Sequence, residues 1–192
     1  MNKQDVVAVV LGGPSSEAEV SRRTGGAIAE ALREKGYNAV EVELVPEKLV
    51  EQLREIDAKV VFNAVHGMYG EDGRLQSILE AIKMPYTGSG VLASAVAMDK
   101  VATKRFLISA NISTPKCLMY NKRFDNDMAK IEKEIIATFG VPVVIKAADQ
   151  GSSIGVEIVK AEADVAAALE NTFKYSDLVL VEECINGKEL TC

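Results

Sequence analysis

The sequence predicts an α/β protein in which an open parallel sheet flanked by helices is followed by an α+β unit. Through the first half, apolar runs of strand length alternate with amphipathic stretches of helical spacing. After residue 90 the pattern restarts, and one of the later strands can return antiparallel. We therefore expect two domains, at residues 1–95 and 96–192, each long enough to have its own core.

The first half begins with a continuous apolar run, residues 6–11, which is typical of a buried parallel strand and ends at a Gly-Gly turn. Apolar residues then recur with helical spacing over residues 19–32. Gly36 follows and can adopt the left-handed conformation that ends a helix. The remaining elements of this half are an edge strand at 39–45, a short helix at 49–53, a strand at 59–65 and a helix at 75–82.

The second half follows a flexible seam at residues 87–90, after which one continuous helix is predicted over residues 91–110. A strand is expected to begin at residue 189 with no partner after it. This abrupt end suggests that the chain is truncated or that another chain supplies the pairing. The other expected elements are strands at 117–120, 143–145, 155–159 and 178–181 and helices around 128–139 and 165–173.

Composition excludes several classes of function. The net charge is −6 and basic residues alternate with acidic ones, so a nucleic acid partner is not expected. No apolar run reaches membrane-spanning length and no signal peptide is recognisable, so no membrane partner is expected either. The three cysteines are sparse, which is typical of a reducing compartment. A cytoplasmic location is therefore predicted.

Lys146 ends a predicted strand and precedes the Gly/Ser-rich loop 151–155. Such a cluster offers a point charge, backbone N–H groups and the hydroxyls of Ser152 and Ser153, which suit a polyphosphate. The spacing differs from the Walker pattern, and a plain hairpin loop with a solvent-facing lysine is an equally good interpretation. Lys100, taken alone, is typical of a surface lysine on an amphipathic helix.

Carboxylates follow the last buried strand. Glu182 and Glu183 end it and Glu189 comes shortly after, where side-chain oxygens could accept hydrogen bonds from an adenine amino group and from ribose hydroxyls. Each of them, taken singly, is also consistent with an ordinary charged residue at a strand end.

Two further candidates follow strands of the first half. Glu17 lies in the turn after the first strand, where ligands bind in open sheets and where a carboxylate suits an ammonium group. It is equally consistent with an acid favoured at a helix N-terminus. His66, the only histidine, begins a glycine-rich loop, although a lone histidine is more often structural. Arg22 is most simply a surface charge.

Eight short segments of the sequence, taken in their order along the chain, resemble the motifs of the D-alanine–D-alanine ligases of the ATP-grasp superfamily. The opening signature is LGGPSSEAEVS at residues 11–21, and HG with GEDG and Gln76 matches the second segment. The resemblance covers the whole chain, and a chance coincidence of all the motifs in order is negligible. The other matching segments are PYTGSG (85–90), AMDK (97–100), VIK (144–146), GSSIG (151–155), EE (182–183) and GKELT (187–191).

The resemblance implies that ATP lies between two sheets. Lys100 and Lys146 would hold its phosphates, and Ser152 and Ser153 would lie in the loop that closes over them. Glu182 and Glu189 would bind adenine and ribose, and Glu183 belongs to the same ATP-binding segment.

The resemblance also implies the reaction. Glu17 would bind the ammonium of the first D-alanine with His66 nearby, which makes Glu17 and Ser152 the catalytic candidates. ATP would activate the carboxylate of the first D-alanine as an acyl phosphate, and the amine of a second D-alanine would attack it. The product is the dipeptide used for peptidoglycan.

The sequence departs from the family pattern in two ways. Ala147 follows the phosphate lysine, where the family usually has proline. The final third of the family, with the ligands of Mg²⁺ (or Mn²⁺), is expected to be missing, so this polypeptide alone is expected to lack ligase turnover. The alternatives are a nucleotide-binding module without catalysis and a ligase that joins D-alanine to D-lactate or D-serine. A homodimer is expected.

Overall fold

The computed structural model describes residues 2–151, 153–188 and 190. The chain forms two compact units, Met1–Ala97 and Met98–Cys192. Each unit has a sheet and hydrophobic clusters of its own, and each is described separately below.

The first unit is built on a three-stranded parallel sheet in the order β2-β1-β3. The central strand is buried along almost its whole length because its side chains are apolar on both faces. The outer strand β2 is buried only at Ala39 and Val42, and its other residues are exposed or half-buried, as expected of an edge strand. The three strands are β1 (Val6–Leu11), β2 (Asn38–Glu43) and β3 (Ala58–Asn63).

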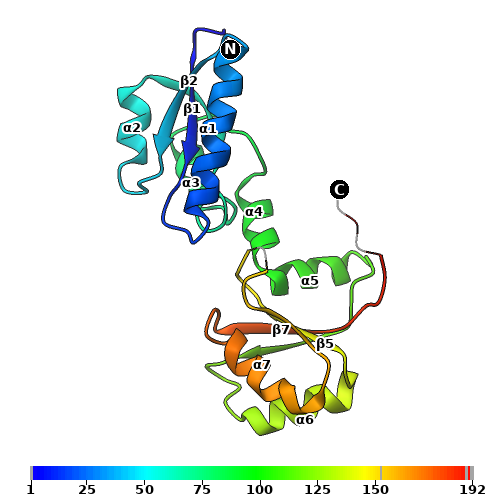
Figure 1. The fold of residues 1–192 in the computed structure, drawn as a ribbon. Coiled ribbons are helices and arrows are strands. Elements are labelled where there is room, and N and C mark those ends of the chain that lie inside the picture. The colour runs from blue at the N-terminus through cyan, green and yellow to red at the C-terminus, as the bar shows by residue number, and fades with distance from the viewer. Residues whose placement is uncertain (1, 152, 189, 191–192) are drawn as a thin grey trace. The chain divides into compact units, whose positions relative to one another are not determined.

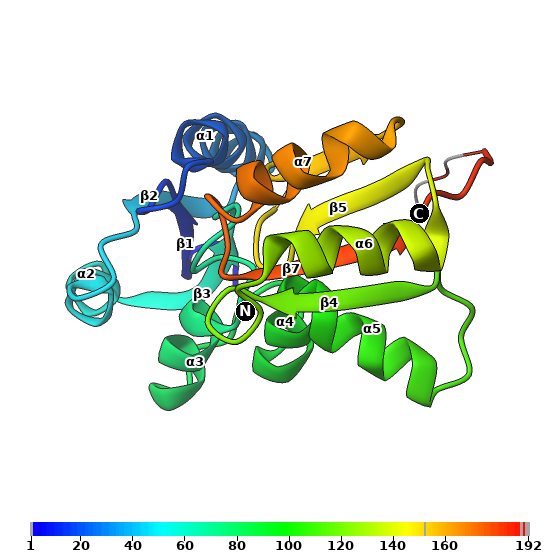
Figure 2. The same ribbon diagram turned by 90° about the horizontal axis from the view of Figure 1, so that it is seen from below.

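Helices cover both faces of this sheet (Figures 1 and 2). Alternation along β1 sends Val9 towards α1, and Ala8 and Val10 towards the opposite cluster, which holds residues of α2 and α3. The predicted open parallel sheet flanked by helices is therefore confirmed. The helices are α1 (Ala18–Glu34), α2 (Leu49–Glu55) and α3 (Arg74–Ala81).

The helix predicted over residues 91–110 is not continuous, and this prediction is wrong. The structure has α4 (Val91–Met98) and α5 (Lys100–Ser109). Asp99 between them is extended, with φ −90° and ψ 103°, and its carboxylate accepts hydrogen bonds from the backbone of Val101 and Ala102, each at 2.9 Å. An aspartate that caps the start of a new helix in this way interrupts the apolar pattern without a glycine or proline.

The second unit contains a four-stranded antiparallel sheet in the order β4-β7-β5-β6. The predicted antiparallel return after the glycine-rich loop is confirmed, because β6 pairs antiparallel with β5. The strand expected to begin at residue 189 lies outside the described residues. The four strands are β4 (Cys117–Asn121), β5 (Val143–Ala147), β6 (Val156–Val159) and β7 (Leu178–Glu183).

The two faces of this sheet have different neighbours (Figure 1). The helices α6 (Met128–Phe139) and α7 (Val165–Thr172) pack on one face, where Val179 and Val181 of β7 join the larger hydrophobic cluster. On the other face Leu180 packs against Val101 of α5 in a smaller cluster. Because strand residues alternate between faces, Glu182 belongs to the α5 face. A short 3₁₀ turn, Glu162–Asp164, leads into α7. The predicted α+β unit is confirmed.

Candidate functional site

The first group of candidate residues lies at the carboxyl end of the parallel sheet. From β1 the chain passes to β2 on one side, then crosses to β3 on the other. The carboxyl ends of β1 and β3 thus form a point where the strand order reverses, which is where open α/β sheets bind ligands. Glu17 follows β1 and His66 follows β3, so the structure brings the two predicted residues to the same edge.

A serine joins the two turns. The hydroxyl of Ser15 donates to the carbonyl oxygen of His66 at 2.8 Å and accepts from the backbone N–H of Glu17 at 3.1 Å. Gly67 has φ +69°, and a Cβ built there would lie 2.7 Å from Oε2 of Glu17. The glycine therefore leaves room for the Glu17 carboxylate as well as supplying the left-handed backbone.

The imidazole of His66 lies between two neighbours. Its Nε2 is 3.2 Å from the hydroxyl of Thr24 on α1, and its Nδ1 is 3.9 Å from Oε1 of Glu71. The other carboxylate oxygen of Glu71 accepts from the backbone N–H of Gly67 at 2.9 Å. These contacts fix the orientation of the ring beside the Glu17 turn.

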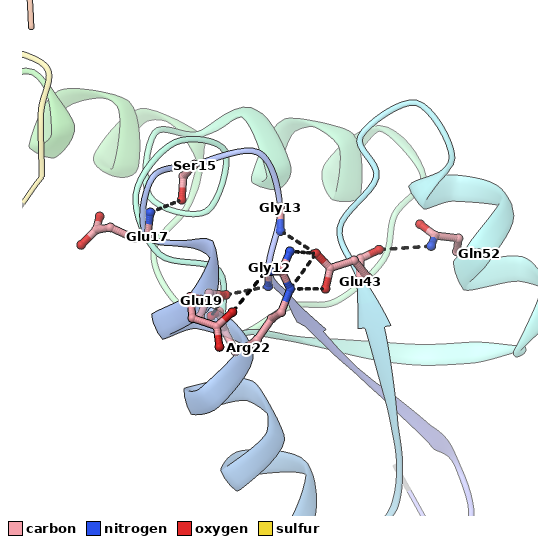
Figure 3. A network of polar contacts seen from close by, with 10 residues as sticks. Gly12, Gly13, Ser15, Glu17, Glu19, Arg22, Glu43 and Gln52 are labelled. Atoms are coloured by element: carbon pink, nitrogen blue, oxygen red, sulfur yellow. Dashed lines mark hydrogen bonds and ion pairs between the residues drawn. The ribbon is translucent and has the colours of Figure 1, made fainter.

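A second network holds the Gly12-Gly13 turn that precedes Glu17 (Figure 3). Oε1 of Glu43 accepts from the backbone N–H of Gly13 at 3.2 Å and from Nη2 of Arg22 at 2.8 Å. The hydrogen bond from Arg22 holds the pKa of the Glu43 carboxyl below its usual value. The carboxylate of Glu17 points away from this network (Figure 3), so it has no part in holding the turn.

The second group of candidate residues lies in the second unit, on the α5 face of the antiparallel sheet. Lys146 of β5 is opposite Leu180 of β7, and Glu182 lies two residues further along β7. Side chains at such diagonal positions share a face and are within reach of each other. The ammonium of Lys146 accordingly forms an ion pair with Oε2 of Glu182.

Glu182 has a second cation on its other oxygen. The ammonium of Lys104, on α5, forms an ion pair with Oε1 of Glu182. Burial raises the pKa of the Glu182 carboxyl, but the hydrogen bonds from Lys104 and Lys146 outweigh this effect and hold the pKa below its usual value. Glu182 is therefore a buried, ionised carboxylate between two lysines.

Lys100 belongs to the same cluster. Its ammonium donates to the carbonyl oxygen of Gln150, and its backbone N–H donates to that of Ala148 at 2.9 Å. Burial, together with the nearby charge of Lys146, lowers the pKa of the Lys100 amine. The structure thus brings the two predicted phosphate lysines together, where their repulsion favours an anionic ligand.

The loop between β5 and β6 closes on itself beside these lysines. The backbone N–H of Ala147 donates to the carbonyl oxygen of Gly155 at 2.7 Å, and Gly155 has φ +64°. Ser153 is exposed on this loop, whereas Ser152 lies outside the described residues. Because proline has no backbone N–H, this hydrogen bond depends on alanine at position 147, where the family usually has proline.

Glu183, the next predicted carboxylate, contacts a different part of the sheet. Oε1 of Glu183 accepts from the backbone N–H of Lys116 at 2.8 Å, where it supports the pairing of β4 with β7. Glu189 lies outside the described residues. Among the residues that the structure does describe, no group of three His, Cys, Asp or Glu side chains could hold a metal ion. No helix in the described part of the chain is long and apolar enough to cross a membrane.

Two further residues shape these groups, and neither is a candidate from sequence patterns alone. Lys104 is one helical turn after Lys100, a spacing that puts both on one face and is the only signal that could have identified it. Glu43 lies at the end of an edge strand and gives no signal, because its partners Gly13 and Arg22 are distant in sequence.

Comparisons with known proteins find matches in both halves of the chain. A family model described as the D-Ala-D-Ala ligase C-terminus matches residues 106–192, and one described as its N-terminus matches residues 43–89. The D-alanine–D-alanine ligases of Pelotomaculum thermopropionicum and Moorella thermoacetica are each 44% identical to the chain over 96% of its length. The chain belongs to the D-alanine–D-alanine ligase family.

Solved structures of this ligase family share the fold. The crystal structure of D-alanine–D-alanine ligase from Bacillus anthracis has a TM-score of 0.84 at 34% identity, and that of its complex with ATP has a TM-score of 0.82 at 32% identity. Each covers 95% of this chain, which spans 58% and 60% of theirs. The chain likewise spans 58% and 60% of the two relatives named above. The predicted family and fold class are confirmed.

Proposed function

We propose that this chain carries the nucleotide site and the first-substrate site of an ATP-dependent D-alanine–D-alanine ligase that works through an acyl phosphate. The observation that carries the proposal is the cluster of Lys100, Lys146 and Glu182 on one face of the second sheet. A solved relative with the same fold binds ATP, which supports a nucleotide as the ligand of this cluster.

The cluster fits the parts of ATP by their chemistry. Two ammonium groups suit the phosphates as charged donors, and their positive charge would stabilise the charge that develops during phosphoryl transfer. Next to Lys146, Val144 and Ile158 are opposite each other on β5 and β6, and Ile158 is exposed. An apolar strip of this kind suits the face of an adenine base, and Glu182 could accept from its amino group.

The proposed first-substrate site is the edge that holds Glu17 and His66. A half-buried carboxylate at this edge would pair with the ammonium of D-alanine and hold its carboxylate for phosphorylation. Phosphorylation makes that carboxylate an electrophile for the amine of a second D-alanine. Peptidoglycan synthesis, a cytoplasmic location, a homodimer and a dependence on Mg²⁺ are further parts of this proposal. The residues described here provide no ligand set for Mg²⁺, and no step is assigned to it.

The matched residues account for about 60% of the length of the relatives. We therefore infer that a polypeptide of these residues alone binds nucleotide but does not turn over D-alanine. Ligation of D-alanine by the purified chain at an ordinary enzymatic rate would contradict this inference.

The nucleotide site can be tested by isothermal titration calorimetry of the 192-residue chain with ATP. Lys146→Met should weaken ATP binding by about tenfold or more, because a charge-assisted hydrogen bond is lost. Lys160→Met, which removes an exposed lysine of the same unit, is the matched control and should bind like the parent chain. An absence of ATP binding by the parent chain would contradict the proposal.

A further inference from the structure

We propose that Lys104 is a positioning residue, a permanent buried counter-ion that holds Glu182 ready for the adenine base while Lys146 is released to the phosphates. This inference rests on the proposed nucleotide site. It assigns different tasks to the two lysines that contact the same carboxylate.

The hydrogen bonds of Lys104 show that it is not itself a phosphate ligand. An ammonium group has three donors, and Lys104 directs its ammonium to three oxygens, which belong to Glu182, Thr114 and Pro115. Its side chain is only 3% exposed. With its donors used and no access to solvent, Lys104 has nothing left to offer a ligand.

Lys146 has the opposite properties. Its side chain is 29% exposed, and its ammonium has one hydrogen-bond partner among the described residues, Oε2 of Glu182. Two donors therefore remain, and the head group can move towards an arriving phosphate. Lys100, whose own pKa is lowered by burial and by the nearby charge of Lys146, would act on the same phosphates.

Movement of Lys146 would leave Glu182 without one of its two cations. A buried carboxylate that loses its only partner is costly and tends to take up a proton. Because Lys104 stays on Oε1, Glu182 remains ionised and fixed in orientation. Its Oε2 is then open to accept an N–H from the base. Oε1 thus fixes the carboxylate through Lys104, and Oε2 binds the base.

The test compares adenosine with ATP on the full chain, using calorimetry or NMR titration. Lys104→Met should weaken adenosine and ATP by the same factor, about tenfold or more, because the acceptor for the base is no longer held. Lys146→Met should weaken ATP much more than adenosine. If Lys104→Met binds adenosine as tightly as the parent chain, the inference is wrong while the nucleotide site stands. If the parent chain binds neither ligand, the proposed function fails and the inference fails with it.

A second measurement needs no variant and so avoids any failure to fold. The ¹³C signal of the Glu182 carboxyl, followed against pH with and without ATP, reports its ionisation. We expect its pKa to stay below the usual value when ATP is bound, because Lys104 remains in place. A rise to the usual value or above on ATP binding would overturn the inference.

Discussion

The two lysines that pair with Glu182 differ in burial, because the side chain of Lys104 is 3% exposed and that of Lys146 is 29% exposed. Lys100 and Lys146 were identified because they stand in recognisable segments. Lys104 was not, because a lysine on an amphipathic helix is usually a surface residue and its burial depends on acceptors outside its own helix, Thr114, Pro115 and Glu182. Buried charges depend on partners that only tertiary folding brings together, so local pattern cannot predict them.

Glu182 should make the stability of the second unit sensitive to acid. Its pKa is lowered in the folded chain, so its ion pairs contribute fully above the unfolded pKa, near 4.5, and this contribution is lost as the pH falls through the folded pKa. Urea unfolding between pH 7 and pH 3 should therefore show a falling free energy of unfolding. Glu182→Gln should be less stable at pH 7, by about 3 kcal/mol, because two cations lose their partner. The free energy of unfolding of this variant should fall less steeply between pH 7 and pH 3 than that of the parent chain. An equally steep fall would contradict the role given to Glu182.

Gly67 offers a residue-scale test of the Glu17 site. Gly67→Ala places a methyl group 2.7 Å from Oε2 of Glu17 at a φ of +69°. Since the carboxylate is the flexible end of its side chain, it should move aside, and D-alanine binding should fall by about tenfold or more as its charged contact is lost.

Gly88→Ala is the matched control for Gly67→Ala. It has φ +103° and nothing within 4 Å of the added methyl group. Both variants should lose about 1–3 kcal/mol of stability to backbone strain. Only Gly67→Ala should lose affinity for D-alanine, measured by calorimetry, and equal losses in both variants would argue against the contact with Glu17.

At the scale of elements, strands and most helices could be predicted because their periodicity is set by burial on one or two faces. The break between α4 and α5 could not, because apolar residues continue on both sides of it and only Asp99 and Lys100 interrupt them. Aspartate is common on exposed helix surfaces, and its role as a cap follows from its extended backbone and its two hydrogen bonds. The break matters for the site because it begins the helix that carries Lys100 and Lys104.

The packing of α1 on the first sheet depends on one of two adjacent glycines. A Cβ at Gly25 would lie 2.6 Å from Cβ of Leu11, whereas a Cβ at Gly26 would meet nothing within 4 Å. Gly25→Ala should therefore destabilise the unit by about 1–3 kcal/mol through overpacking. Gly26→Ala should stabilise the helix by roughly 0.5–1 kcal/mol. Thermal unfolding of the pair gives the comparison, and a stabilising Gly25→Ala would contradict the close approach of helix and strand.

At the scale of the whole molecule, alternation of elements was enough to predict a parallel sheet followed by a different unit. The strand orders β2-β1-β3 and β4-β7-β5-β6 were not predicted, because they depend on long-range pairing that leaves no local signal. The strand order in each sheet determines which candidate residues lie next to each other. Glu17 and His66 share an edge because β1 is central, and Lys146 and Glu182 share a face because β7 pairs with β5.

The first unit should fold by itself, because its clusters are made of residues from within residues 1–97. A polypeptide of these residues should unfold in a single cooperative transition in urea, followed by circular dichroism. Leu79 is fully buried in the core, so Leu79→Ala should lower the free energy of unfolding by about 2–5 kcal/mol. A gradual transition without a midpoint would show that the unit is not an independent domain.

The lowered pKa of Lys100 also has a consequence for chemical labelling. An amine reacts with acylating reagents only in its neutral form, and a lower pKa makes that form more abundant near neutral pH. A limiting amount of an activated ester should therefore acylate Lys100 ahead of exposed lysines such as Lys160, as peptide mass spectrometry would show. Bound ATP should slow this modification. The amine of Lys100 would then be an attachment point for covalent ligands directed at the nucleotide site.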